Sequence, residues 1–419
     1  MENNKPKFST IIIFLVSFSV FWSSSFLSIS IGSVQLTLYR LFLACFVVVT
    51  LLEGTKYIEV KTYEAKTMIF WWIYAVISVI WVKDISGWIK AVFFITCALL
   101  ALFCLSKCFD RVQNIEIFIR GLVVAGLVFI AFGIFEVETG LYLFQGIPMT
   151  DAAIITRRKH IPLFVTNGAN AYALIVCFFF FIMLIMFLKT DKKRRKLFFG
   201  MLTISCLYLV YKTESRGVLA GLLFGIIMLI FFSIRKRIQR RQVFTLFTVF
   251  FLAIAFLIAL LFGFEPLSFL GGEESDIIRL NLIKSGWDFL TETCFMGVGA
   301  GNIEYWMANK SHIYMMGYTN MHNWYMEILV GYGIIVFTLF LIMVVKMIKK
   351  LVFIYEQTNN KIISSYAFGF LGWNYAFLIA CISDSNNTDN EWMWLMYAAV
   401  IAFNAIYYEK VFGQRDITI

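Results

Sequence analysis

The chain has 419 residues, of which 61% are hydrophobic and 15% are charged, and its formal net charge at pH 7 is +10. This much apolar sequence, gathered in runs of about 20 residues, is more than the core of a soluble protein can bury. A soluble globular domain is therefore excluded, and a helical membrane protein is predicted. The positive charge does not indicate a nucleic-acid partner, because most of it lies in connections where anionic lipid headgroups can neutralise it.

About twelve apolar segments are long enough to predict membrane-crossing helices. In chain order they cover residues 10–31, 34–52, 67–82, 86–106, 117–136, 167–188, 196–212, 216–234, 243–263, 323–345, 362–383 and 391–408. Lys5 and Lys7 precede the first segment, as in a signal peptide, but its apolar character continues to Ile31 without a small-residue cleavage site. We therefore predict an all-α integral membrane protein in which residues 1–419 form one polytopic domain.

The distribution of positive charge predicts the orientation. Most of the 36 lysine and arginine residues fall in alternate connections, including the runs KTDKKRRK from residue 189 and RKRIQRRQ from residue 235. Positively charged connections tend to stay in the cytoplasm, so both chain ends are predicted to lie inside. Two long connections, 137–166 and 264–322, would then face outwards, the second of them between the ninth and tenth helices. Long outer connections favour chemistry at the outer face over transport.

The second long connection contains an amphipathic pattern. In SDIIRLNLIKSGWDFL, residues 275–290, Ser275 or Asp276 would cap a helix, and Ile283, Trp287 and Leu290 recur at helical spacing. We predict a helix that lies along the membrane surface.

A glycine-rich stretch, CFMGVGAGN at residues 294–302, follows the predicted surface helix. Its third glycine comes one position early for a dinucleotide fingerprint, and the stretch does not follow a buried strand. It predicts a tight turn at which the backbone passes close to a helix or a ligand.

Several arginines on the predicted outer side run against the positive-inside trend and need a physical reason. A diphosphate at the membrane surface would provide one, because guanidinium groups bind phosphate oxygens in pairs. The alternative is that each arginine pairs with a nearby acid, such as Glu214 beside Arg216, or contacts lipid phosphate. The candidate diphosphate-binding residues are Arg40, Arg157, Arg158, Arg216 and Arg279.

His322 lies in MHNWYMEILVGYG, residues 321–333, where polar sequence gives way to the tenth helix. A neutral imidazole can accept a proton near pH 7. Metal-binding, Walker and nucleophile-turn motifs are not found, so no cofactor is expected. We predict that His322 deprotonates a hydroxyl while arginines stabilise a leaving diphosphate. The alternative is a helix-end residue beside a capping Asn320 or Asn323.

Four further side chains are candidate accessory contacts: His160, Lys284, Asn323 and Glu327. Lys284 can also be a solvated charge, and His160 a plain surface residue. Glu327 lies about one helical turn below His322 and needs a partner within a membrane, so it could orient the site or bond Tyr325 and neighbouring helices.

Two other polar stretches have a simpler alternative. Asp384 and Asp389 in SDSNNTDNEW could contact sugar hydroxyls, but a solvated turn accounts for them as well. Asn167 and Asn170 could contact a ligand or cap the sixth helix.

Four stretches, in this order, resemble the O-antigen ligase and bacterial polysaccharide polymerase superfamily: FVTNGANAYAL, ESRG, RLNLIKSGWDFLTETCFMGVGAGN and MHNWYMEILVGYGIIVF. The resemblance covers about residues 157–345. Gly168 is a departure, because the family often has proline there.

The resemblance implies a metal-independent glycosyltransferase at the outer face of the bacterial inner (plasma) membrane. Its donor would be an oligosaccharide linked to undecaprenyl diphosphate. Arg216 and Arg279 would bind the diphosphate, and His322 would be the catalytic base.

Three functions remain open from the sequence. A polymerase, favoured on the family's properties, would pass the chain to another lipid-linked repeat unit, and a protein regulating chain length would be an expected partner. A ligase would pass the finished glycan to another acceptor, such as lipid A core, since the two activities differ only in the acceptor glycan. A lipid-linked oligosaccharide flippase could also have twelve helices, whereas a structural scaffold would not need His322.

Overall fold

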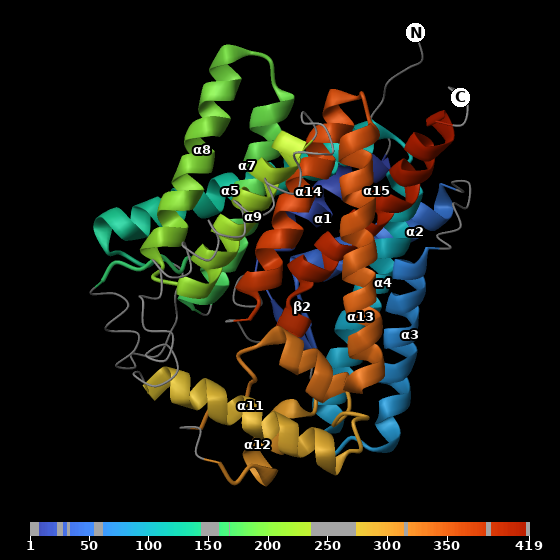
Figure 1. Cartoon of the computed structure of the whole chain (residues 1–419), viewed down its shortest axis with the longest axis vertical. Helices are drawn as coiled ribbons and strands as arrows, with labels where there is room; N and C mark the ends of the chain where they lie inside the picture. Colours follow the sequence, from blue (N-terminus) through green and yellow to red (C-terminus); the bar gives the residue numbers. More distant parts are fainter. Residues whose placement is uncertain are drawn as a thin grey trace.

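The computed structural model describes residues 8–22, 28–31, 34–53, 62–143, 159–166, 168–235, 274–313, 317–382 and 387–415. This part of the chain is mostly helical (Figure 1). Its elements are α1 (Phe8–Ser19), β1 (Ile29–Ile31), β2 (Val34–Leu36), α2 (Leu38–Leu52), α3 (Tyr63–Ile77), η1 (Ser78–Ile80), α4 (Ile85–Cys108), α5 (Val112–Thr139), α7 (Ala169–Lys189), α8 (Lys193–Lys212), α9 (Arg216–Arg235), α11 (Glu274–Glu292), α12 (Ile303–Lys310), α13 (Trp324–Gln357), α14 (Lys361–Ala380), η4 (Asn387–Asp389) and α15 (Glu391–Arg415).

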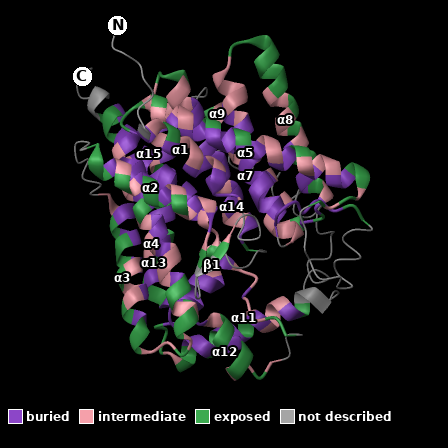
Figure 2. Cartoon of the chain, turned by 180° about the vertical axis from the view of Figure 1, so that it is seen from behind, coloured by how far each residue is buried: buried purple, intermediate pink, exposed green. Residues whose placement is uncertain are grey.

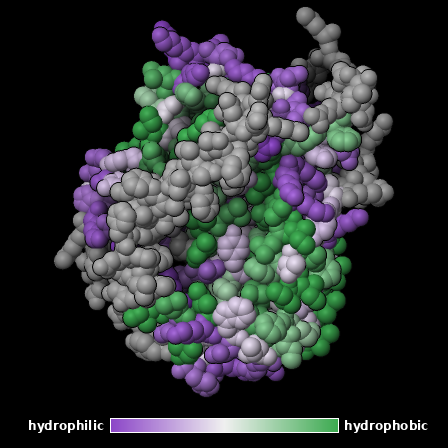
Figure 3. All heavy atoms as spheres, viewed as in Figure 1, coloured by the Kyte–Doolittle hydropathy of each residue, from purple (hydrophilic) through white to green (hydrophobic). Residues whose placement is uncertain are grey.

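Six of the described helices are long and apolar enough to span a membrane: α4, α5, α7, α9, α13 and α14. α3 adds an exposed apolar face that includes Ile69, Phe70 and Ile73. Figure 3 shows hydrophobic residues over much of the centre and lower right of one face, with hydrophilic residues at its upper and lower ends. The prediction of a helical, multi-pass membrane protein is confirmed, whereas the number of spans and the side of the termini stay predictions. The predicted segment 243–263 lies outside the described residues.

Close helix packing forms the interior of the bundle. Buried residues gather between the helices, and α15 is buried along most of its first three turns (Figure 2). α9 approaches α14 at two glycines: a Cβ at Gly221 would lie 2.5 Å from the Ala376 carbonyl oxygen, and one at Gly225 would lie 2.7 Å from that of Gly372. Small residues of this kind let helix backbones approach within a membrane, where packing rather than the hydrophobic effect drives association.

The first predicted helix, 10–31, is wrong at its C-terminal end. α1 ends at Ser19, and β1 and β2 form an antiparallel pair in which Ile29 faces Leu36 and Ile31 faces Val34. The sequence SISIGSVQL alternates apolar and polar residues around a Gly-Ser pair, which is the pattern of a hairpin rather than of a helix. The prediction missed the change from a helical to an alternating pattern because the whole stretch is apolar in composition.

α11 and α12 lie together at one end of the bundle, opposite the start of α1 and the end of α15 (Figure 1). α11 confirms the predicted helix but differs in detail. It begins at Glu274, so Ser275 and Asp276 lie in its first turn rather than at its cap. Leu290 is buried against α13, whereas Trp287 is 48% exposed, so the two predicted apolar positions do not share one protein contact.

The glycine turn, defined as residues 297–301, joins α11 and α12 to a break in α13. Gly333 has φ 77° and ψ 176° and interrupts that helix. The freed backbone groups pair with the turn: Val298 N–H donates to the Val330 carbonyl at 2.8 Å, and Gly299 N–H to that of Gly331 at 3.0 Å. Ile334 N–H donates to the carbonyl of Phe295, just before the turn, at 3.0 Å. Internal pairing of this kind lets a membrane helix tolerate a break.

The glycine turn and Asn302, which directly follows it, also contact the connection between α3 and α4 and the start of α4. The Asn302 Oδ1 accepts hydrogen bonds from the backbone N–H groups of Lys83 and Asp84, both at 2.8 Å. A Cβ at Gly301 would lie only 2.1 Å from the Gly87 carbonyl oxygen. The predicted tight turn close to a helix is therefore confirmed.

We expect Gly301→Ala to lower the free energy of unfolding by roughly 1–3 kcal/mol more than Gly317→Ala, because only position 301 lacks space for a Cβ. Both glycines have positive φ, 66° at Gly301 and 79° at Gly317, so alanine would be strained at either position. Only at Gly317, however, does nothing lie within 4 Å of an added Cβ. Denaturant and thermal unfolding in detergent would measure the difference. Equal stability of the two variants would contradict the close contact.

Candidate functional site

His322 lies immediately before α13, at the same end of the molecule as α11 and α12. It has φ 45°, an uncommon value for a residue with a side chain. The next residue, Asn323, is the N-cap of α13, and its side chain accepts a hydrogen bond from the Met326 N–H at 3.2 Å. Trp324 N–H donates to the Cys381 carbonyl at 3.1 Å, which ties this helix start to the end of α14. Asn323 thus has the capping role that was one of the two alternatives for it, and the cap holds His322 in place.

The surroundings of His322 favour its neutral form. The imidazole is partly buried and lies edge to face with the Tyr318 ring, 5.4 Å between centroids. Burial lowers the pKa of His322, and the positive charge of Arg279 lowers it further. At neutral pH the ring therefore carries no charge and can accept a proton.

Arg216 and Arg279 come from different helices. Arg279 projects from α11 within electrostatic range of His322, so the structure brings these two predicted residues together. Arg216 is exposed at the start of α9, at the end of that helix nearer α11 (Figure 1). The adjacent Glu214, proposed as a partner of Arg216, makes an ion pair of 2.8 Å with Lys159.

Arg40 has local partners. Its Nε donates to Glu391 Oε1 at 2.6 Å, and its guanidinium lies 4.9 Å from the ring centroid of Phe93 and 5.2 Å from that of Phe94. These contacts give Arg40 the acidic partner that was the alternative to diphosphate binding. Two other candidates, Arg157 and Arg158, lie outside the described residues.

Three other predicted contacts, His160, Lys284 and Asn170, lie in separate parts of the chain. The His160 Nδ1 lies 2.9 Å from the Val137 carbonyl oxygen near the end of α5. Lys284 is on the exposed face of α11. α7 begins at Ala169 with Gly168 as its N-cap and no side-chain capping bond, so Asn170 is not the cap. Asn167 and Asp384 lie outside the described residues.

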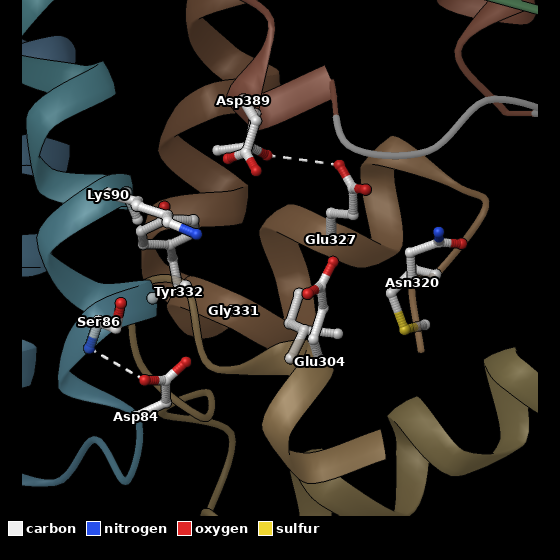
Figure 4. Close-up of a pocket in the computed structure, with 15 residues that line it drawn as sticks. Asp84, Ser86, Lys90, Glu304, Asn320, Glu327, Gly331, Tyr332 and Asp389 are labelled. Carbon is white, nitrogen blue, oxygen red and sulfur yellow. Dashed lines mark hydrogen bonds between the residues drawn. The ribbon is translucent and has the colours of Figure 1, made fainter. Parts of the chain in front are cut away.

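A pocket of about 160 Å³ opens between α4, α12, α13 and η4 (Figure 4), and His322 itself does not line it. Asn320 and Met321, which directly precede the histidine, form part of its wall. The other residues that line it are Asp84, Ser86, Gly87, Lys90, Ala91, Gly301, Ile303, Glu304, Glu327, Gly331, Tyr332, Thr388 and Asp389. Sequence reasoning proposed Glu327 and Asp389 separately but missed Asp84 and Glu304. Asp84 and Glu304 lie far apart in the chain, and no spacing in the sequence indicates that they share a pocket.

Glu327 is 5% exposed and accepts a hydrogen bond from the Thr388 hydroxyl at 3.4 Å, one of the bonds marked in Figure 4. The Tyr325 hydroxyl instead donates to the Leu378 carbonyl at 2.8 Å, so the expected bond between Tyr325 and Glu327 is wrong, whereas contact with a neighbouring element is found. Glu327 thereby links the start of α13 to η4.

Asp389 faces the pocket from η4. The surroundings of its carboxyl group in the pocket wall raise the pKa of Asp389, with a contribution from repulsion by Glu304, while Lys90 acts in the opposite direction; the residue as a whole stays exposed. The pocket therefore concentrates negative charge, whereas His322 is next to a cation. In the described part of the chain, His, Cys, Asp and Glu side chains form no group of three or more suited to a metal ion.

Comparisons with known proteins add independent information. Residues 201–341 match the family described as O-antigen ligase. The chain is also 24% identical over 418 residues to the teichuronic acid biosynthesis protein TuaE of Bacillus subtilis (strain 168), covering 95% of this chain and 84% of that protein. The matched region contains Arg216, Arg279 and His322. These findings confirm the resemblance predicted from the sequence.

We expect Arg279→Gln to raise the pKa of His322 towards its ordinary value without fully restoring it, because burial, the larger cause, remains. Histidine labelled with ¹³C at Cε1 would give three NMR signals to titrate, and loss of one in His322→Gln would assign it. Lys284→Gln, which removes an exposed cation from the same helix, is the matched control. A larger shift in the control would contradict the assigned contact.

Proposed function

We propose that this chain, whose residues 201–341 match the family described as O-antigen ligase, is a glycosyltransferase of the bacterial plasma membrane. Its donor is an oligosaccharide on undecaprenyl diphosphate, and it polymerises such repeat units at the outer face. The observation that carries the proposal is a partly buried imidazole inside the family-matched region, whose pKa is lowered by burial and by the positive charge of Arg279.

In the proposed reaction His322 takes the proton from an acceptor hydroxyl. The hydroxyl oxygen forms a bond to the anomeric carbon of the donor as the bond from that carbon to the diphosphate oxygen breaks. The electron pair leaves with the diphosphate, whose charge Arg216 and Arg279 stabilise. Because His322 is neutral, it can accept the proton of the acceptor hydroxyl. The positive charge of Arg279 stabilises the diphosphate as it leaves.

The lowered pKa follows from the same arrangement. A cation close to the base disfavours imidazolium before substrate binds, but the dianionic diphosphate would offset that cation once bound. Substrate binding would therefore raise the basicity of His322 in the loaded site. An arginine can therefore lie close to the catalytic base, because the bound diphosphate offsets the effect of the arginine on the pKa of His322.

Ligation is the second candidate, favoured by the description of the matched family. It uses the same donor chemistry but a different acceptor. The name of the relative, a teichuronic acid biosynthesis protein, suits either activity in the making of a cell-envelope glycan.

We expect the purified protein to extend lipid-linked glycans extracted from its native host, in the presence of EDTA, into a ladder of lengths. His322→Gln should lower the rate by roughly 10²–10⁴-fold, the usual effect of losing a general base. His312→Gln, at an exposed histidine ten residues earlier in the chain, is the control. A single transfer to an added acceptor would indicate a ligase, and full activity of His322→Gln would disprove its role as base.

We expect Arg216→Lys and Arg279→Lys each to slow transfer roughly 10-fold or more, because a lysine cannot reproduce two-point contact with phosphate. Arg120→Lys, at an exposed ion pair on α5, should keep the wild-type rate. The initial rate of glycan extension would be measured for all three. Wild-type rates in both site variants would argue against diphosphate binding there.

A further inference from the structure

The pocket that Asn320 and Met321 help to line, just before His322 in the chain, has an electrostatic character opposite to that of a diphosphate site. Carboxylates come from Asp84, Glu304, Glu327 and Asp389, and Lys90 is the single cation among the lining residues. Such a surface repels a dianion, whereas carboxylates accept hydrogen bonds from hydroxyl groups and an ammonium group donates them. The pocket therefore suits a ligand rich in hydroxyl groups and without negative charge.

Several lining groups retain hydrogen-bonding capacity. Among the described residues, the buried Asn320 Oδ1 has no hydrogen-bond donor, although it lies two residues before His322. Lys90 and Glu304 form no ion pair within the described chain. Figure 4 shows the Lys90 amine extending from α4 towards α13, and Glu304 reaching from α12 towards Glu327. A buried acceptor without a donor favours a ligand that supplies one.

The size and the wall of the pocket further limit the kinds of ligand that it can bind. A volume of about 160 Å³ is below the roughly 300–1,000 Å³ of pockets for drug-sized molecules. It suits one ring at the end of a glycan rather than a whole repeat unit. Tyr332 forms part of the wall, held edge to face by Trp71 at 5.2 Å, and provides a rigid apolar surface among the polar groups.

We propose that this pocket binds the terminal sugar of the acceptor, a neutral polyhydroxylated ring, and presents one of its hydroxyl groups to His322. The assignment rests on the proposed glycosyltransferase function and adds the acceptor side of that site. Donor diphosphate and acceptor sugar then occupy regions of opposite charge on the two sides of one histidine. The acidic pocket excludes the diphosphate, and the arginines attract it.

Binding of the free glycan tests the pocket apart from catalysis. Lipid-linked glycans of the native host would be cleaved from their lipid by mild acid, and the affinity of the free oligosaccharide for full-length protein in detergent would be measured by saturation-transfer NMR. We expect Glu304→Gln and Asp389→Asn each to weaken binding roughly 10-fold or more, because each removes a charged acceptor. Inorganic pyrophosphate should bind these variants and the wild type alike.

Two controls sharpen the comparison. Asp288→Asn removes an exposed carboxylate of α11 that does not line the pocket, and it should leave both affinities unchanged. Arg279→Gln should weaken pyrophosphate binding and leave glycan binding within about twofold, the reverse of the pocket variants. Unfolding midpoints would show that each variant is folded, and Glu304 is exposed enough for its substitution to be tolerated.

The outcomes separate the two proposals. Wild-type glycan affinity in both pocket variants, or no glycan binding by the wild-type protein, would overturn the pocket assignment and leave the base and arginine roles untouched. A pocket variant that loses pyrophosphate affinity 10-fold without losing glycan affinity would reassign the pocket to phosphate. Full transfer by His322→Gln would overturn the proposed mechanism, while the binding result would still decide the pocket.

Discussion

Backbone hydrogen bonds between the glycine turn and the break in α13 hold together the end of the bundle that carries His322. They satisfy the polar groups that the break at Gly333 would otherwise leave unpaired within an apolar bundle, and in doing so they fix α11 and α12 against α13. Contact at this distance requires glycine on both sides, since a Cβ at Gly297 would lie 2.6 Å from the Gly333 nitrogen, and one at Gly333 would lie 2.5 Å from the Met296 carbonyl oxygen. The arrangement of α11, α12 and α13 around the candidate site follows from this contact.

The same contact creates the difference in charge across the site. By docking α11 against the start of α13, it brings Arg279 towards His322. By docking the start of α12 between α4 and α13, it places Glu304 opposite Asp389 and Lys90. A cation thus acts on His322, while an acidic pocket lies against Asn320 and Met321, the two residues that precede it. Electrostatic complementarity of this kind would order two substrates, one charged and one neutral, before any bond changes.

Particular residues show where sequence reasoning succeeded and failed. The glycine turn was predicted correctly, because closely spaced glycines before a polar residue are typical of a turn at which two backbones meet. The end of the first helix was wrong, because apolar composition outweighed a change from helical to alternating period. Diphosphate binding by Arg40 stays a prediction, but the sequence did not indicate its partner Glu391, 351 residues away. No local sequence pattern predicts an ion pair between residues so far apart in the chain.

The sequence by itself determined that this is a helical membrane protein with a long polar segment, a glycine turn and a histidine at the start of a late helix. Those features depend on composition, on the period of the apolar residues and on local backbone preference. All three are properties of residues close together in the sequence. Only the tertiary structure decided that Arg279 acts on His322, that Asn323 caps the helix, and that Asp84, Glu304, Glu327 and Asp389 share one pocket. Most of those relations join segments separated by tens to hundreds of residues, and they exist only once close backbone packing has brought the segments together.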